Sequence, residues 1–163
     1  MLALVKEYFW IFFISMVPIV ELRGAVPAGL AMGLPVIPTY IVSVIGNMLP
    51  VPVILLFAKA VLLWCTKLPG GLGRFFMKIY YKGVKAGEKM QAKAGRGIYW
   101  ALFLFVAIPL PGTGAWTGCL AATLLDLKFW PSVLAVLCGV MTAGLIMGAA
   151  SAGLLGALGM IFA

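Results

Sequence analysis

The chain has 163 residues, of which 64% are hydrophobic and only 10% are charged, and it contains no histidine. A soluble domain of this size needs more polar side chains to cover its surface, so the composition excludes a soluble protein and predicts an integral membrane protein. A few helices tilted through about 30 Å of hydrocarbon would use nearly all of the length. We therefore expect one membrane domain, residues 1–163, and no separate soluble domain.

The available side chains also restrict the chemistry. The sequence has no histidine, no clustered carboxylates and no phosphate-binding loop with its lysine, so we expect no enzyme activity, no metal and no cofactor. Cys65, Cys119 and Cys138 are odd in number and scattered through apolar segments, which indicates packing residues rather than disulfides or metal ligands. The first seven residues lack the positive start and the cleavage site of a signal peptide, so we expect that none is removed.

The first hydrophobic block, residues 8–34, is interrupted by helix-stopping residues from Pro18 to Pro27. Each apolar half has about 7 to 13 residues, which is too short to span a bilayer. Such halves suit a re-entrant helical hairpin, which enters and leaves the membrane on the same side. The second block, residues 36–66, is long enough to cross with tilt or a kink. Asn47, Pro50 and Pro52 should bend it, because a proline removes a backbone hydrogen bond and clashes with the preceding turn.

A hydrophilic segment, residues 67–97, separates the first two blocks from the last two. Its basic residues recur every three or four positions, which would place seven of them within roughly a 100° arc of one helix face. This pattern predicts a helix in the headgroup region that contacts anionic lipid phosphates through Arg74, Lys78, Lys82, Lys85, Lys89, Lys93 and Arg96. One alternative is a solvated basic loop that only sets orientation. Gly83 and Gly87 also leave open two shorter helices. The charge bias places the segment in the cytoplasm, and we expect no nucleic-acid binding.

The third block, residues 98–125, is broken between Pro109 and Gly118 and predicts a second re-entrant hairpin. Gly112, Thr113 and Gly114 would leave backbone N–H groups free at the start of a half-helix, where the dipole favours an anion. Trp116 could stack on the tail of a bound amphiphile or shield it. Alternatively, it is an interfacial anchor or a packing residue. The fourth block, residues 129–163, is the second crossing helix. Lys59 is expected to snorkel, so that its long apolar side chain carries the ammonium group to the membrane interface. Asp126 and Lys128 are expected to flank the membrane.

The two halves of the chain resemble each other in pattern, with Gly24 falling on Gly114 and Leu30 on Leu120. Each unit, residues 8–66 and 98–163, combines one re-entrant hairpin with one crossing helix. Because each unit then crosses the membrane an odd number of times, two tandem copies must lie in opposite orientations. The sequence therefore predicts an all-α protein with two inverted repeats and both termini outside, a layout typical of transporters.

Glu21 and Arg23 are the charged residues of the first break, where a charge at membrane depth usually faces a cavity and a partner. Glu21 is a candidate proton carrier. Arg23 is a candidate grip for a phosphate or carboxylate, because its guanidinium is always charged and forked. Together with Gly24 and Asn47 they would share a site with the glycines and Trp116 of the second break. The alternative is that the two charges pair with each other, or cap the half-helix that begins at Gly24.

These residues, Glu21-Leu-Arg23-Gly24-Ala-Val-Pro27 and Pro109-Leu-Pro-Gly-Thr-Gly-Ala-Trp-Thr-Gly118, resemble the small multidrug export protein family of prokaryotes over essentially the whole chain. That family is similar to the DedA-type membrane proteins, and this resemblance implies paired re-entrant hairpins and proton-dependent flipping of polyprenyl-phosphate lipids. The arginine that DedA-type proteins carry two residues after Gly112 is Gly114 here. Arg23 would therefore have to hold a phosphate alone.

The expected function is proton-coupled transport of an amphiphile, either an anionic polyprenyl-phosphate lipid or a small drug. Alternatives are a proton/cationic-drug antiporter and a non-transporting membrane scaffold. The expected partners are membrane lipids, a small-molecule substrate and a second copy of the chain, because Gly144, Gly148, Ala152 and Gly156 form a stripe that permits close packing within the fold or across a homodimer. The expected location is the inner (plasma) membrane of a prokaryote.

Overall fold

The computed structural model describes the backbone of residues 2–94, 97–110 and 112–162. It does not describe the side chains of residues 2–3, of several residues in 79–94, or of residues 154–162. The prediction of an all-helical protein is confirmed for these residues. In chain order the helices are α1 (Leu2–Met16), α2 (Glu21–Ala31), α3 (Val36–Met48), α4 (Pro50–Thr66), α5 (Gly71–Ala94), α6 (Gly97–Ala107), α7 (Ala115–Leu124) and α8 (Phe129–Phe162).

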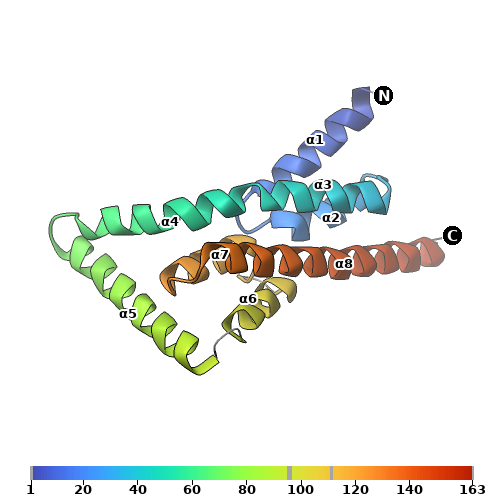
Figure 1. Ribbon diagram of the computed structural model, residues 1–163. Coiled ribbons are helices and arrows are strands. Elements are labelled where there is room, and N and C mark those ends of the chain that lie inside the picture. The colour runs from blue at the N-terminus through green and yellow to red at the C-terminus, as the bar shows by residue number, and fades with distance from the viewer. Residues whose placement is uncertain (1, 95–96, 111, 163) are drawn as a thin grey trace.

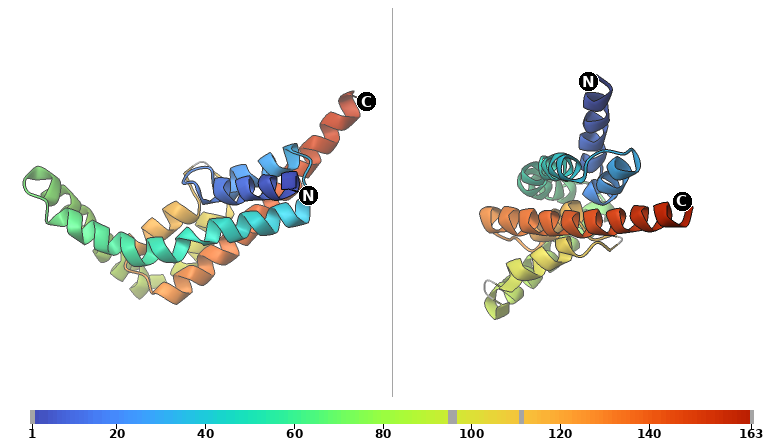
Figure 2. Two further views of the ribbon diagram at one scale, coloured as in Figure 1. Left: turned by 90° about the horizontal axis from the view of Figure 1, so that it is seen from above. Right: turned by 90° about the vertical axis from the view of Figure 1, so that its right-hand side faces the viewer.

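Two long apolar helical rods dominate the fold. One is formed by α3 and α4 together, Val36–Thr66, and the other is Phe129–Gly153 of α8; both have a mean hydropathy of 2.2 and enough length to cross a bilayer. They are the long helices predicted for the second and fourth blocks. Figures 1 and 2 show that the rods run in opposite directions, and α3 contacts α8 directly.

The predicted interruption of the first rod lies at Leu49, between α3 and α4. Leu49 keeps helical dihedral angles, with φ −61° and ψ −44°. The pattern of helical hydrogen bonds is interrupted here because Pro50 has no N–H group to donate to the carbonyl of Gly46, four residues earlier. The rod therefore loses backbone hydrogen bonds at its middle while it continues in helical conformation.

Both predicted helix breaks are present, and both are shorter than predicted. Residues 17–20 separate α1 from α2, and residues 108–110 and 112–114 lie between α6 and α7. The prediction that the first break extends to Pro27 is wrong, because α2 begins at Glu21 and continues through this proline. A proline inside a helix is tolerated in a membrane protein where neighbouring helices compensate for the lost hydrogen bond.

The short helices pack across the two halves of the chain. Helix α1 lies on α2 and α3, α6 lies on α8, and each half reaches the other where α2 contacts α8 and α7 contacts α4. Glycine allows the close approach of α2 and α3 to α8, since a Cβ atom on Gly144 would lie 2.7 Å from the Tyr40 ring and 2.8 Å from Leu22. At Gly144 the predicted small-residue stripe therefore serves packing inside the fold.

The basic segment forms one continuous helix, α5, so the alternative of two shorter helices is wrong. Its other residues are mostly good helix formers, which outweigh a cost of about 1 kcal/mol for each internal glycine. Figure 1 shows α5 leaving the end of α4 at an angle, to one side of the long rods. Four basic side chains of α5 are exposed: Arg74, Lys78, Lys82 and Lys85. The side chains of Lys89 and Lys93, and all of Arg96, lie outside the described residues.

Candidate functional site

The helices on either side of the first break contact the second break and the start of α7. The indole N–H of Trp116, in the first turn of α7, donates a hydrogen bond to the carbonyl of Met16 at the end of α1, with an N···O distance of 3.1 Å. Trp116 is half-buried and packs against the hydrophobic cluster of the interior. Residues about 100 positions apart therefore form one polar junction between the two halves.

Glu21 caps the N-terminus of α7. Its side chain is 4% exposed, and its carboxylate accepts hydrogen bonds from the backbone N–H groups of Ala115, at 3.2 Å to Oε2, and Trp116, at 3.0 Å to Oε1. The first N–H groups of a helix have no partner within the helix, and the helix dipole favours a negative charge beside them. The place that the sequence predicted for an anion is thus occupied by the protein's own carboxylate.

Gly114 makes this contact sterically possible. A Cβ atom at Gly114 would lie 2.2 Å from Oε2 of Glu21, and its φ of 153° is one that residues with side chains rarely adopt. Gly112 has a φ of 82° but lies in open space, so it serves only the turn. Thr113 closes the turn, because its hydroxyl oxygen lies 2.8 Å from the carbonyl oxygen of Ile108.

Arg23 binds the other end of the second break. Its Nη1 donates to the carbonyl of Leu110 at 2.5 Å and also to that of Thr113, and its Nη2 donates to the carbonyls of Val106 at 3.1 Å and Ile108 at 3.2 Å. Val106 lies in the last turn of α6 and Ile108 directly follows that helix, where backbone oxygens lack helical partners and the dipole favours a positive charge; Leu110 and Thr113 lie further along the break. One guanidinium therefore binds four backbone oxygens at the end of α6 and in the break.

The charged pair thus binds the two helix ends that flank the second break. Glu21 holds the start of α7 and Arg23 holds the end of α6, while neither forms an ion pair with the other in the described structure. Of the two alternatives from the sequence, pairing and capping, the structure is closer to capping. The helix ends that are capped belong to α6 and α7, whereas the sequence suggested a half-helix beginning at Gly24. Gly24 lies inside α2, where a Cβ atom would come within 2.4 Å of Cγ1 of Val20.

Asn47 is fully buried on α3, and its amide oxygen and nitrogen have no hydrogen-bond partner among the described residues. Ser43, one turn earlier, is also fully buried, and its hydroxyl is likewise without a partner. The sequence indicated Asn47 and missed Ser43. The spacing of four residues between them, on a helix, was the signal that could have found it.

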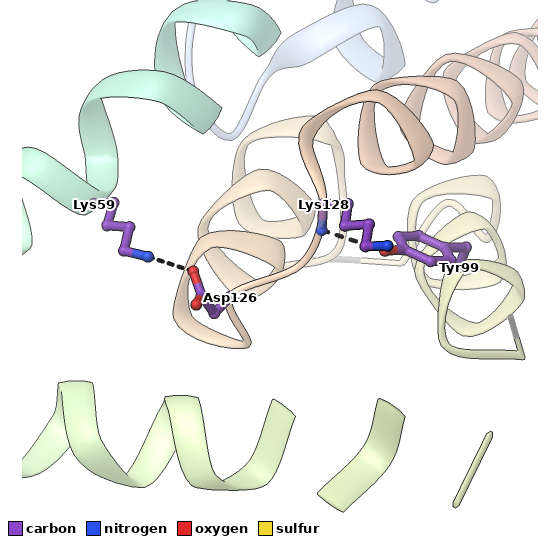
Figure 3. Close-up of polar contacts among 4 residues, drawn as sticks. All are labelled: Lys59, Tyr99, Asp126 and Lys128. Carbon is purple, nitrogen blue, oxygen red and sulfur yellow. Dashed lines mark hydrogen bonds and ion pairs between the residues drawn. The ribbon is translucent and has the colours of Figure 1, made fainter. Parts of the chain in front are cut away.

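A second polar contact joins the two halves at the end of α7. Nζ of Lys59 in α4 lies 2.5 Å from Oδ1 of Asp126, and the backbone N–H of Lys128 donates to the hydroxyl of Tyr99 at 3.2 Å (Figure 3). Sequence reasoning treated Lys59, Asp126 and Lys128 as separate interface residues. It missed the ion pair because its two members are 67 positions apart.

We expect this ion pair to contribute little stability, because its side chains are 40% and 49% exposed. Exposed pairs are worth at most about 1 kcal/mol, so Lys59→Gln and Asp126→Asn should each change the free energy of unfolding by no more than that. Asparagine is the suitable replacement, since Asp126 has a φ of 52°, which Asn tolerates. A double-mutant cycle in detergent measures the coupling. A coupling of several kcal/mol would mean that the pair is shielded from solvent.

The sequence profile of the family described as "Putative small multi-drug export protein" matches residues 21–146. The chain belongs to this family. The matched region begins at Glu21, directly after the first break, and contains the second break, Arg23 with its contacts, and Asn47. No curated protein and no solved structure matches the chain. Membership of an export family, together with two rods able to cross a bilayer, identifies a membrane protein.

Proposed function

We propose that this member of the small multi-drug export family is a proton-coupled transporter in which Glu21 is exchanged for an anionic cargo group at the start of α7. The observation that carries the proposal is the buried Glu21 carboxylate on the N–H groups of Ala115 and Trp116. A helix N-terminus can bind either a phosphate or a carboxylate. The site is therefore suited to an anion and is filled by a group that a proton can neutralise.

The proposed cycle follows from charge. When a proton binds Glu21, the negative charge leaves the start of α7 and its two N–H groups lose their charged acceptor. An anionic headgroup of an amphiphile, such as a polyprenyl phosphate or an acidic drug, then takes that place. Arg23 holds the adjacent turn in shape and supplies the positive charge beside it. Loss of the proton returns Glu21 to α7 and expels the cargo.

The proposed topology is two inverted units, residues 8–66 and 98–163, each a re-entrant hairpin followed by a crossing rod. It is supported by the same order of helices in both halves, by the opposite directions of the rods and by the packing of each half on the other's long helix. The basic helix α5, with Lys67 before it, argues for a cytoplasmic position of this end in a prokaryotic inner membrane.

Two other functions remain alternatives. In a proton/cationic-drug antiporter Glu21 would bind the cation, but Arg23, two residues away, would repel it. A non-transporting scaffold is favoured by one observation, namely that Glu21 and both terminal nitrogens of Arg23 already have protein partners. In that case the two charges only fasten the hairpins together, and no enzyme activity is proposed in either case.

A flux measurement in proteoliposomes tests the proposed function. Glu21→Gln keeps the size of the side chain but cannot titrate, so uptake of a labelled amphiphilic phosphate should become independent of an imposed pH gradient while binding of the phosphate persists. Lys59→Gln, which alters a charge away from the junction, is the matched control and should keep the gradient dependence. Equal gradient-driven flux in wild type and Glu21→Gln would exclude Glu21 as the proton carrier, whereas no flux above that of protein-free liposomes in either would favour the scaffold.

We further propose that α5 lies on anionic lipid headgroups. A surface hollow on α5 is lined by Arg74, Met77, Lys78 and Tyr81, so basic groups there stand beside apolar and aromatic ones, as in helices that lie at a membrane interface.

Changing Lys78, Lys82 and Lys85 to Gln in the full chain should reduce co-purification of anionic lipid, since each basic residue near such a surface contributes about 1 kcal/mol. Native mass spectrometry measures the retained lipid, and zwitterionic lipid is the control. The proposal fails if the triple variant retains as much anionic lipid as the wild type.

A further inference from the structure

The buried face of α3 carries three polar side chains at intervals of one turn, Thr39, Ser43 and Asn47, and all three are 0% exposed. The hydroxyl of Thr39 donates to the carbonyl of Pro35 at 2.8 Å, which is the usual arrangement for a threonine in an apolar helix. The hydroxyl of Ser43 and the amide of Asn47 have no partner among the described residues. The unpartnered groups are thus confined to two adjacent turns.

Buried polar groups without a protein partner, such as those of Ser43 and Asn47, are expected to bind another molecule. A buried polar atom without a hydrogen bond costs free energy, and native interiors satisfy nearly all of them with protein or with ordered water. The carbonyl of Gly46, between the two residues, is a third available group, because Pro50 has no N–H to donate to it. Two to four polar partners are what a buried water requires.

The mixture of donors and acceptors identifies the molecule. A metal cation would bind the oxygen atoms but would leave the amide N–H groups of Asn47 and the hydroxyl hydrogen of Ser43 without acceptors. Water both donates and accepts, so it matches the whole set. We propose that Ser43, Asn47 and the Gly46 carbonyl hold ordered water inside the first rod, at the turn that precedes the proline interruption.

The face of α3 that holds this water continues into the hydrophobic cluster at the junction. Val51, one turn after Asn47 on the same face of the rod, belongs to the hydrophobic cluster that contains Leu22 and Ala115. Leu22 follows Glu21 in the chain, and Ala115 donates to the Glu21 carboxylate. The water site and the Glu21 carboxylate therefore border the same hydrophobic cluster, and the proposal of the water does not depend on the proposed function.

Asn47 is the only asparagine of the sequence, which allows a direct test. The full chain, labelled with asparagine carrying ¹⁵N in its side-chain amide, is reconstituted in lipid bilayers for solid-state NMR. Transfer of magnetisation from water to the single Asn47 side-chain signal should be as fast as for groups in contact with water. Only slow transfer, like that of buried backbone amides, would overturn the proposal.

Two variants separate shared water from general hydration. Ser43→Ala removes one of the partners of the water, so the fast transfer to Asn47 should be lost or slowed and its amide signal should shift. Thr39→Val, on the same face one turn earlier, removes a hydroxyl that already has a protein partner and should leave both unchanged. An Asn47 signal that is identical in Ser43→Ala and wild type contradicts a shared water. No flux is measured, so a failure of the transport mechanism would not affect this result.

Discussion

Replacing Arg23 with glutamine should strongly destabilise the detergent-solubilised protein, because four backbone carbonyls lose their charged donor at once. Hydrogen bonds from a charged group contribute about 1.5–3 kcal/mol each and are not additive, so we expect a total loss of about 3 kcal/mol or more in the free energy of unfolding. In the proposed topology these carbonyls lie at membrane depth, where little water can replace the guanidinium. Titration with SDS from mixed micelles measures the loss.

The conservative variant Arg23→Lys should lie between wild type and Arg23→Gln. A lysine keeps the positive charge but presents one compact ammonium group in place of a planar fork, so it cannot reach all four oxygens. Arg74→Gln, on the exposed face of α5, is the control for loss of an arginine charge and should leave the free energy of unfolding nearly unchanged. If Arg23→Gln were no more destabilising than Arg74→Gln, the contacts with the second break would contribute nothing.

Combining Arg23→Gln with Glu21→Gln should not restore stability. A pair that is bonded to itself is rescued when both charges are removed, because neither is left buried alone. Here each charge holds a different half-helix, so the double variant should be less stable than either single variant. Rescue in the double variant would show that Glu21 and Arg23 neutralise each other. It would support the scaffold alternative if flux were also unchanged.

Replacing Gly114 with alanine should have an effect of similar size. The added methyl group would lie 2.2 Å from Oε2 of Glu21, so the carboxylate must leave the start of α7 and its two hydrogen bonds are lost. The backbone conformation, with φ 153°, adds strain of the order of 1–3 kcal/mol for a residue with a side chain. We expect a total loss of about 3 kcal/mol or more in the same titration.

Gly112→Ala is the matched control for Gly114→Ala. Gly112 also has a positive φ, of 82°, but its Cβ position is open, so this variant measures backbone strain without the collision. Adding Glu21→Ala to Gly114→Ala should make the combined loss smaller than the sum of the two single losses, since the collision no longer occurs. If Gly114→Ala were no worse than Gly112→Ala, the contact between Gly114 and Glu21 would not constrain the break.

The class of protein and its main elements are determined by local properties of the sequence. Two apolar runs of more than 20 residues have only the bilayer as a suitable solvent, so the rods 36–66 and 129–153 follow from hydropathy and length. The breaks near Pro18 and Pro109, and the interruption at Pro50, follow from proline and glycine, which act on the neighbouring backbone whatever surrounds them. The family likewise follows from residues in sequence order.

The ends of the breaks depended on tertiary structure. Pro27 reads as a helix stop, yet α2 runs through it because α1, α3 and α8 pack around that helix and stabilise it. Gly83 and Gly87 read as weak points, yet α5 is continuous. In both cases a local preference of about 1 to 3 kcal/mol was outweighed by the rest of the helix and its contacts.

The composition of the site also depended on tertiary structure. The sequence showed that the start of α7 would attract an anion and that Arg23 would seek oxygen atoms, because these are properties of a helix end and of a guanidinium. It could not show that Glu21 is the anion or that the oxygens belong to the chain itself, since these partners lie 83 to 95 positions away. Pairing over such distances depends on how the two halves pack, and no local spacing encodes it.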